Sequence, residues 1–134
     1  MTKKEENIAN IKQANILIVA WFLLWTTTAQ AQTIQASYYS EASLIREGTR
    51  KPGEKQITAS GEVFKDGAMT CACRMFPLGS ILRITYHGKS ILVRVNDRIG
   101  KRFAKTRIDL SIGAFKALAP VRLGLITVNV ERIK

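Results

Sequence analysis

The sequence predicts a mainly β protein that closes into a small barrel. Three features support this: several short segments rich in β-branched residues, long loops between them, and a single short segment of helical character. The chain has 134 residues, 46% of them apolar, so it can form one domain with a modest core. A closed barrel suits a sheet of this size because closure leaves no strand edge unpaired.

The N-terminal segment has the features of an export signal. After a start that contains three lysines, residues 16–25 are ten consecutive uncharged, apolar residues. A membrane span needs about 20 such residues, so this run has the length of a signal-peptide core instead. Ala29 and Ala31 are small residues at the positions that a signal peptidase reads, and we expect cleavage after Ala31. An uncleaved N-terminal anchor is the alternative.

We therefore expect a signal peptide at 1–31 and one mature domain at 32–134. Because no cysteine lies near the cleavage site, we expect no lipid attachment there, and export by the Sec route to the periplasm or beyond. Of the net charge of +11, the mature part keeps +10. A protein this basic is attracted to anionic polymers, and no basic helix or base-stacking motif indicates nucleic acid.

The mature domain begins with a strand and a long loop. Residues 34–39 alternate loosely between two faces and are expected to form the first strand. Residues 40–56 then turn polar and include Gly48, Pro52 and Gly53, which predicts a loop of 17 residues. A loop of this length in a compact domain usually serves a function.

A hairpin is predicted in the middle of the mature domain. Residues 80–86 and 90–95 are both rich in β-branched side chains. His87, Gly88 and Lys89 lie between them, and so short a connection with a glycine is typical of a tight hairpin turn.

Residues 110–118 form the segment of helical character. Ser111 can cap such a helix, and Pro120 would end it soon after. Residues 125–131 then alternate cleanly between apolar and polar side chains, and we expect them to form the last strand.

Carboxyl groups are the side chains that glycosidic chemistry needs, because the leaving oxygen must be protonated as positive charge develops on the sugar. The mature domain has eight of them. Five are expected to be solvated surface groups: Glu41, Glu47, Glu54, Asp66 and Glu131.

Glu62, Asp97 and Asp109 occupy more informative places. Glu62 follows Gly61, where the backbone can turn sharply or approach a ligand closely. Asp97 ends the second hairpin strand, and Asp109 directly precedes the predicted helix. On spacing alone, Asp97 can instead pair with a neighbouring arginine and Asp109 can cap the helix.

Cys71 and Cys73 are the only cysteines. Side chains at i and i+2 of a strand point to the same face, and a disulfide between them would close a small, strained ring. Together with His87 they are too few for a structural zinc site, and we expect no metal or other cofactor. We expect both thiols to be reduced, with one facing the cleft. Plain packing, or an intermolecular or strained bridge in an oxidising compartment, are the alternatives.

Five blocks of the sequence resemble the rare lipoprotein A (RlpA) family. In order along the chain they are ASYY (36–39), TASGEVF (58–64), TCACRMFPLGS (70–80), VRVNDR (93–98) and RIDLS (107–111). One block alone would be a weak match, but five in order behind an export signal are specific, and they cover nearly the whole mature domain.

The resemblance implies a six-stranded double-psi β-barrel with one or two short helices, the fold of expansins and barwin-like proteins. It also implies binding to peptidoglycan and an endolytic transglycosylase activity that cleaves glycan strands to 1,6-anhydro-muramic products. We further expect a monomer that meets the membrane only through its signal segment. The family's acidic residues fall on Glu62 and Asp97, which we expect to be catalytic, Asp97 as the acid/base and Glu62 as the partner that stabilises developing positive charge. Six further residues are expected to contact substrate: Tyr39, Cys73, Arg74, Asn96, Arg98 and Asp109.

The sequence departs from the family pattern at two places. The family histidine is Cys73 here, and its Gly-Pro after Asp-Arg is Ile99-Gly100, followed by a slightly longer loop. A neutral thiol is a weak donor with a higher pKa than imidazole, so it does not replace the histidine fully. A non-catalytic, expansin-like module that binds polysaccharide is therefore the main alternative, and a secreted toxin or effector built on the same barrel is another.

Overall fold

The computed structural model describes residues 2–5 and 30–134. The predicted signal-peptide core at 16–25 lies outside the described residues, and the boundary between residues 31 and 32 stays a prediction. Within the part of the chain that is described, no helix is long and apolar enough to cross a membrane.

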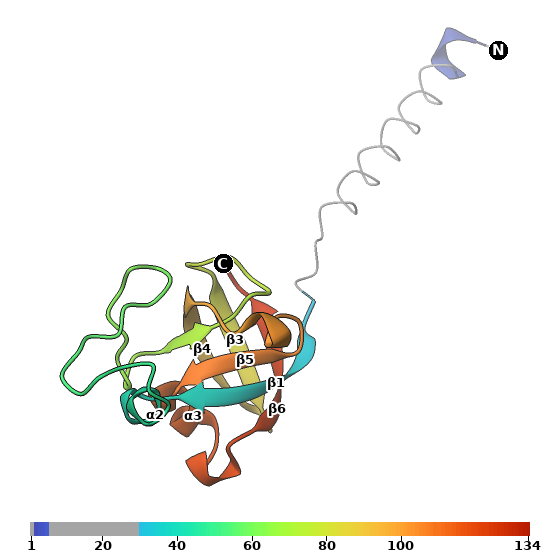
Figure 1. Cartoon of the computed structure of the whole chain (residues 1–134). Helices are drawn as coiled ribbons and strands as arrows, with labels where there is room; N and C mark the ends of the chain where they lie inside the picture. The colour runs from blue at the N-terminus through green and yellow to red at the C-terminus, as the bar shows by residue number, and fades with distance from the viewer. Residues whose placement is uncertain (1, 6–29) are drawn as a thin grey trace.

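Six strands close a barrel in the order β1-β5-β2-β4-β3-β6 (Figure 1). Their bounds are β1 Gln32–Tyr39, β2 Thr70–Ala72, β3 Ile81–Tyr86, β4 Lys89–Asp97, β5 Arg107–Ser111 and β6 Ile126–Arg132. β1 runs parallel to β5 and β2 runs parallel to β4, whereas the other four neighbouring pairs are antiparallel. The predicted six-stranded closed barrel is confirmed.

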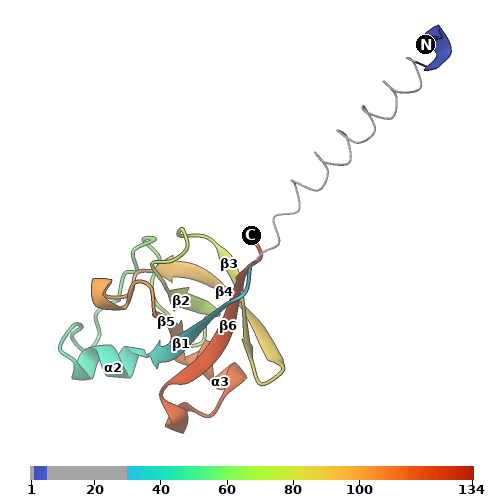
Figure 2. The ribbon, with the colours of Figure 1, turned by 90° about the vertical axis from the view of Figure 1, so that its right-hand side faces the viewer.

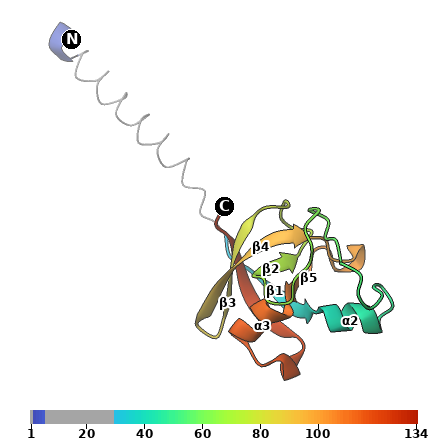
Figure 3. The ribbon, with the colours of Figure 1, turned by 90° about the vertical axis from the view of Figure 1, so that its left-hand side faces the viewer.

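Short helical segments connect the strands. They are α2 Glu41–Arg46, α3 Ile112–Leu118 and two 3-10 turns, η1 Lys101–Phe103 and η2 Val121–Leu123. Helix α3 lies against the barrel end away from the C-terminus (Figure 3) and buries Ala114, Phe115 and Leu118. Ser111 caps it by accepting the Ala114 N–H (3.2 Å), as the sequence predicts.

The interior is filled by alternate side chains of the strands. Ile34 and Ala36 of β1 point inward, as do Val93 and Val95 of β4. The predicted hairpin joins β3 to β4 through a two-residue turn. His87 has φ 45° and Gly88 has φ 76°, the left-handed pair that a type I′ turn requires.

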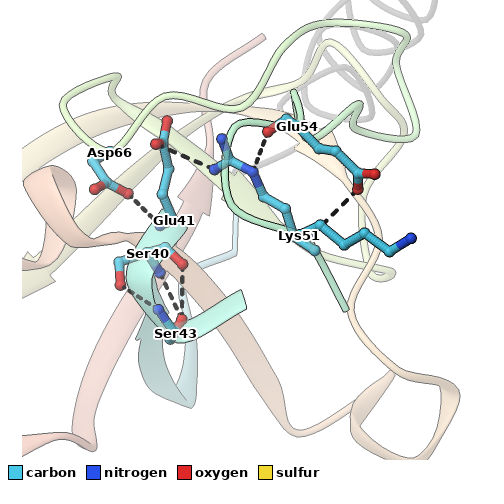
Figure 4. Close-up of polar contacts among 7 residues, drawn as sticks. Ser40, Glu41, Ser43, Lys51, Glu54 and Asp66 are labelled. Carbon is cyan, nitrogen blue, oxygen red and sulfur yellow. Dashed lines mark hydrogen bonds and ion pairs between the residues drawn. The ribbon is translucent and has the colours of Figure 1, made fainter. Parts of the chain in front are cut away.

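The segment predicted as one long loop contains a helix. α2 occupies its first third and extends from the end of β1, outside the barrel (Figure 2). Ser40 Oγ accepts the Ser43 N–H (3.1 Å) and Ser43 Oγ accepts the Ser40 N–H (2.9 Å), a reciprocal capping box (Figure 4). The sequence signal was weak because the third helical residue is serine rather than Glu or Gln, and because α2 buries no residue.

Three of the acidic side chains expected to be solvated hold this segment in place (Figure 4). Asp66 Oδ1 accepts the Glu41 N–H at the start of α2 (2.7 Å), and the Glu41 carboxylate pairs with Arg50 (3.2 Å). Glu54 Oε2 accepts the Lys51 N–H (3.3 Å). These contacts hold α2 to the residues that follow it and to the turn that contains Asp66.

Gly113 of α3 is required by a close approach of two backbones. Its N–H donates to Asp66 O (2.8 Å). A Cβ at this position would lie 2.7 Å from Asp66 O and 2.9 Å from the Cα of Gly67, closer than real Cβ atoms come. The helix start therefore fixes the chain that leads into β2.

Replacing Gly113 by alanine should lower the free energy of unfolding. Alanine is favoured over glycine in a helix by about 1 kcal/mol, but overpacking costs about 1–3 kcal/mol, and here the clash is with backbone atoms. We expect a lower urea midpoint. Gly100→Ala is the matched control because a Cβ there meets nothing within 4 Å. Equal midpoints for the two variants would contradict the contact.

Candidate active site

Four residues form a row across the outer face of the barrel, which we call the acid row. Ser37 pairs with Asp109 between β1 and β5, Asp109 pairs with Ala72 between β5 and β2, and Ala72 pairs with Asp97 between β2 and β4. Paired residues project from the same side of a sheet. Two strand spacings separate the Cα atoms of Asp97 and Asp109 by about 10 Å. The row thus places two carboxyl groups on one face.

A β-bulge turns Asp97 outward. Val93 and Val95 point into the core, and regular alternation would send Asp97 after them. The register between β2 and β4 shifts at this point, so that Cys71 pairs with Val95 but Ala72 pairs with Asp97. Asn96 is the extra residue, and Asp97 joins the outer face as a result.

The wall of the acid row is apolar. Tyr39, Phe64, Ala72 and Ile99 form a buried cluster separate from the barrel core. The rings of Tyr39 and Phe64 stack with centroids 4.4 Å apart. Ile99 thus adds an apolar side chain beside the acid row.

Burial raises the pKa of Asp109 above its usual value, while the hydrogen bond from Ser37 Oγ (2.8 Å) opposes this by stabilising the ionised form. Burial also raises the pKa of Tyr39, and the charges of Asp97 and Asp109 add to that effect. The Tyr39 hydroxyl is buried and has no hydrogen-bond partner among the described residues.

The carboxylate of Asp97 is fixed by backbone. Its Oδ1 accepts the N–H of Ala59 (3.0 Å) and of Arg98 (2.8 Å). The first donor belongs to the turn at residues 58–62, which is itself tied to β4 because the Ser60 N–H donates to Asn96 O (3.0 Å). Both N–H groups donate to Oδ1, so Oδ2 of Asp97 is left to contact a ligand.

Glu62 lies at the end of the same turn but is paired with Arg94. Both guanidinium nitrogens of Arg94 donate to its carboxylate, the second over 2.7 Å, and Ser60 Oγ donates as well (3.2 Å). This pairing with Arg94 is the main reason that the pKa of Glu62 falls to about 2. The carboxylate stays charged, but the charge of Arg94 offsets its own.

An open pocket of about 660 Å³ lies beside this ion pair, and we call it the Glu62 pocket. It is lined by Lys55, Glu62, Val63, Lys65, Ala68, Thr70, Arg94 and Asn96. The turn at 58–62 connects Glu62 to Asp97, because it contains Glu62 and its Ala59 N–H donates to the Asp97 carboxylate. The second carboxyl group of the acid row, however, is that of Asp109. Sequence reasoning did not identify Ser37, Thr70 or Arg94 as parts of the site.

The remaining predicted contacts are distributed around the site. Arg74 is exposed, and its Nε donates to Ile99 O. Arg98 donates to Cys73 O (2.6 Å) and Phe76 O (2.7 Å), so it braces the loop after β2. Asn96 is only 2% exposed. Neither Arg94 nor Arg98 forms an ion pair with Asp97, and Ser111 rather than Asp109 caps α3.

The two thiols are free and both are fully buried in the barrel core. The expectation that one of them faces the cleft is therefore wrong, because alternation sends Cys71 inward and the chain keeps Cys73 inside. Burial raises the pKa of both thiols. Within residues 2–5 and 30–134, no three His, Cys, Asp or Glu side chains gather closely enough to hold a metal ion.

The closed barrel with two parallel strand pairs defines a double-psi β-barrel, and solved structures support this class. The Streptomyces papain inhibitor matches with a TM-score of 0.60 and 22% identity, over 78% of this chain and 96% of that one. An expansin of Clavibacter michiganensis matches with a TM-score of 0.58 and 19% identity, over 78% and 51%. At these identities the likeness concerns the fold alone.

The sequence pattern of the lytic transglycolase family matches residues 31–130, and the chain belongs to this family. It is 38% identical over 104 residues to a probable endolytic peptidoglycan transglycosylase RlpA of Nostoc, which covers 75% of this chain and 27% of the relative. It is 43% identical over 88 residues to the endolytic peptidoglycan transglycosylase RlpA of Pseudomonas aeruginosa, covering 64% and 25%. The chain thus spans about a quarter of the length of these relatives.

The carboxyl of Glu62 should titrate near pH 2, and Arg94→Gln should move the midpoint back toward 4.5, the ordinary value. Carboxyl-detected NMR measures this directly. Because the folded pKa is the lower one, the ion pair stabilises the fold above about pH 4.5 and loses its effect as the pH falls toward 2.

Arg83→Gln is the control for this titration, since it removes a different arginine pair, that with Glu131 (3.3 Å). It should leave the Glu62 midpoint unchanged. A midpoint that stays near 2 in Arg94→Gln would show that Arg94 is not the cause.

Proposed function

We propose that the protein is an endolytic peptidoglycan transglycosylase that cleaves glycan strands to 1,6-anhydro-muramic products. The observation that carries this proposal is the acid row, with Asp97 and Asp109 about two strand spacings apart on one outer face. Carboxyl groups about 5–10 Å apart across a groove suit glycosidic chemistry. The names of the RlpA relatives and the family membership support the same activity.

The two aspartates can divide the proton transfers. Asp109, whose pKa is raised by burial, keeps a proton and donates it to the glycosidic oxygen as the bond to C1 breaks. Asp97, held by two N–H donors, accepts the proton of the muramic 6-hydroxyl, whose oxygen bonds to C1. One C–O bond breaks and one forms, no water is consumed, and the two carboxyls exchange protonation states.

Glu62 is the third carboxylate of the site, and it remains a candidate to stabilise positive charge on the sugar. Its pairing with Arg94 weakens that effect and gives it a second role, which is to hold the turn at 58–62 against Asp97. Tyr39, Arg74 and Asn96 stay proposed substrate contacts. Cys73 contributes through its backbone, since its N–H donates to Asp97 O (3.0 Å).

The setting of this activity is also a proposal. The expected export signal and the +10 charge of the mature domain suit a monomer that works on an anionic cell-wall polymer outside the cytoplasm. The RlpA relatives are named for an action on peptidoglycan, which supports a glycan as the partner.

A binding module without turnover is the second candidate. It is favoured by the expansin among the fold neighbours, one of whose structures is a complex with cellohexaose. It is also favoured by Cys73, since a buried thiol stands where the family has a histidine. Binding to purified sacculi without release of soluble anhydromuropeptides would support this candidate over the enzyme.

Asp97→Asn should slow turnover strongly and leave binding intact. Asparagine keeps the shape of the side chain and its accepting Oδ1, but it cannot take up a proton. We expect about 10²–10⁴-fold slower release of anhydromuropeptides from purified sacculi. Glu131→Gln, which alters the ion pair between β3 and β6, is the control and should release product normally. Release at the wild-type rate by Asp97→Asn would refute the assignment.

Asp109→Asn should inactivate the enzyme and stabilise it at neutral pH. Because the folded pKa of Asp109 is raised, its contribution to stability is present below its ordinary pKa of 3.8 and is lost as the pH rises through the folded value. Relative to wild type, the variant should therefore gain stability between pH 3 and pH 7 in urea unfolding. A stability difference that does not change with pH would argue against a buried, ionisable Asp109.

A further inference from the structure

The Glu62 pocket contains two buried polar atoms without partners. Thr70 on β2 is 4% exposed and Asn96 on β4 is 2% exposed. Neither Thr70 Oγ1 nor Asn96 Oδ1 has a hydrogen-bond partner among the described residues. Buried polar groups are nearly always paired, and an unpaired one that lines a pocket is free to meet a ligand. A hydroxyl or amide N–H of a ligand would satisfy both.

The charge of the pocket is positive. Arg94 and Glu62 offset one another, and the lining has no other acidic residue. Lys55 and Lys65 are exposed at its edge, and none of the ion pairs within the described residues includes either of them. Two uncompensated ammonium groups beside unpaired hydroxyl and amide oxygens suit a sugar that bears a carboxylate.

The pocket adjoins the acid row. Asn96 lines the pocket and is the chain neighbour of Asp97, and the turn at 58–62 carries both Glu62 and the N–H that holds Asp97. The turn at 58–62 therefore links the pocket, through Glu62, to the carboxylate of Asp97, through the Ala59 N–H.

We propose that the Glu62 pocket is a binding subsite for a sugar residue carrying a carboxylate. In this subsite Thr70 and Asn96 hydrogen-bond to polar groups of the sugar, and Lys55 and Lys65 attract its carboxylate. The proposal rests on the glycan-cleaving function above and names the chemistry that the site selects. The carboxylate belongs to the sugar ring's own substituent or to an attached peptide, and the test separates these sources.

Thr70→Val tests the subsite without removing a structural contact. Valine has the same shape as threonine, and the hydroxyl it removes has no partner within the protein. A purely structural Thr70 predicts unchanged binding. The subsite predicts an unfolding midpoint equal to or above that of wild type, together with several-fold weaker binding of the full chain to purified sacculi.

The lysine charges are tested by a matched pair of double variants. Lys55→Gln with Lys65→Gln removes two charges at the pocket, and Lys101→Gln with Lys105→Gln removes two exposed charges from the loop before β5. Because it loses two exposed charge contacts, the Lys55/Lys65 variant should bind sacculi about tenfold more weakly than the Lys101/Lys105 variant does. On sacculi whose carboxylates have been converted to methylamides with carbodiimide, this difference should vanish. On glycan strands without peptides, the difference in binding should persist if the carboxylate belongs to the sugar ring's substituent. It should vanish if the carboxylate belongs to the peptide.

The outcomes separate this proposal from the proposed function. If wild type releases no anhydromuropeptides but binding still depends on Lys55, Lys65 and carboxylates, the enzymatic function fails and the subsite stands. If wild type cleaves sacculi while both lysine variants bind equally and Thr70→Val binds like wild type, the subsite is overturned.

Discussion

The site depends on one irregularity in strand pairing. The bulge at Asn96 turns Asp97 from the core face to the outer face, next to Ala72 and in line with Asp109. Without it, Asp97 would follow Val93 and Val95 into an apolar interior, where an isolated carboxylate is strongly disfavoured. The parallel pairing of β2 with β4 and the closed barrel hold this register, so the fold itself orients the carboxylate.

Three carboxyl groups of the candidate site are set to different states by their surroundings. A bidentate arginine keeps Glu62 charged, burial beside Tyr39 favours the protonated form of Asp109, and backbone N–H groups hold one oxygen of Asp97. A reaction that needs both a proton donor and a proton acceptor requires such a separation. The apolar cluster around Tyr39 provides it, because burial disfavours charge.

Four of the six strands, the hairpin and the Ser111 cap follow from local patterns, since alternation and turn residues act over a few positions. β2 was not predicted because it has only three residues, and β5 was not because its last two residues had been assigned to the helical segment at 110–118. Helix α2 was missed because its capping box uses Ser43 and because it buries no residue fully, although Leu44 packs against the cluster around Tyr39. Asp109 was expected to contact substrate, but its place beside Asp97 depends on the order β5-β2-β4, which no local pattern reveals. The inward position of Cys73 likewise depends on how the loop after β2 is held by Arg98.

The dependence of cleavage on pH tests the central claim most directly, namely that a buried Asp109 supplies the proton. The rate of anhydromuropeptide release should fall as the pH rises through the raised pKa of Asp109. Ser37→Ala removes the hydrogen bond that lowers this pKa, so the fall should move to higher pH. A profile without such a fall while the protein stays folded, or one that Ser37→Ala leaves in place, would contradict the account.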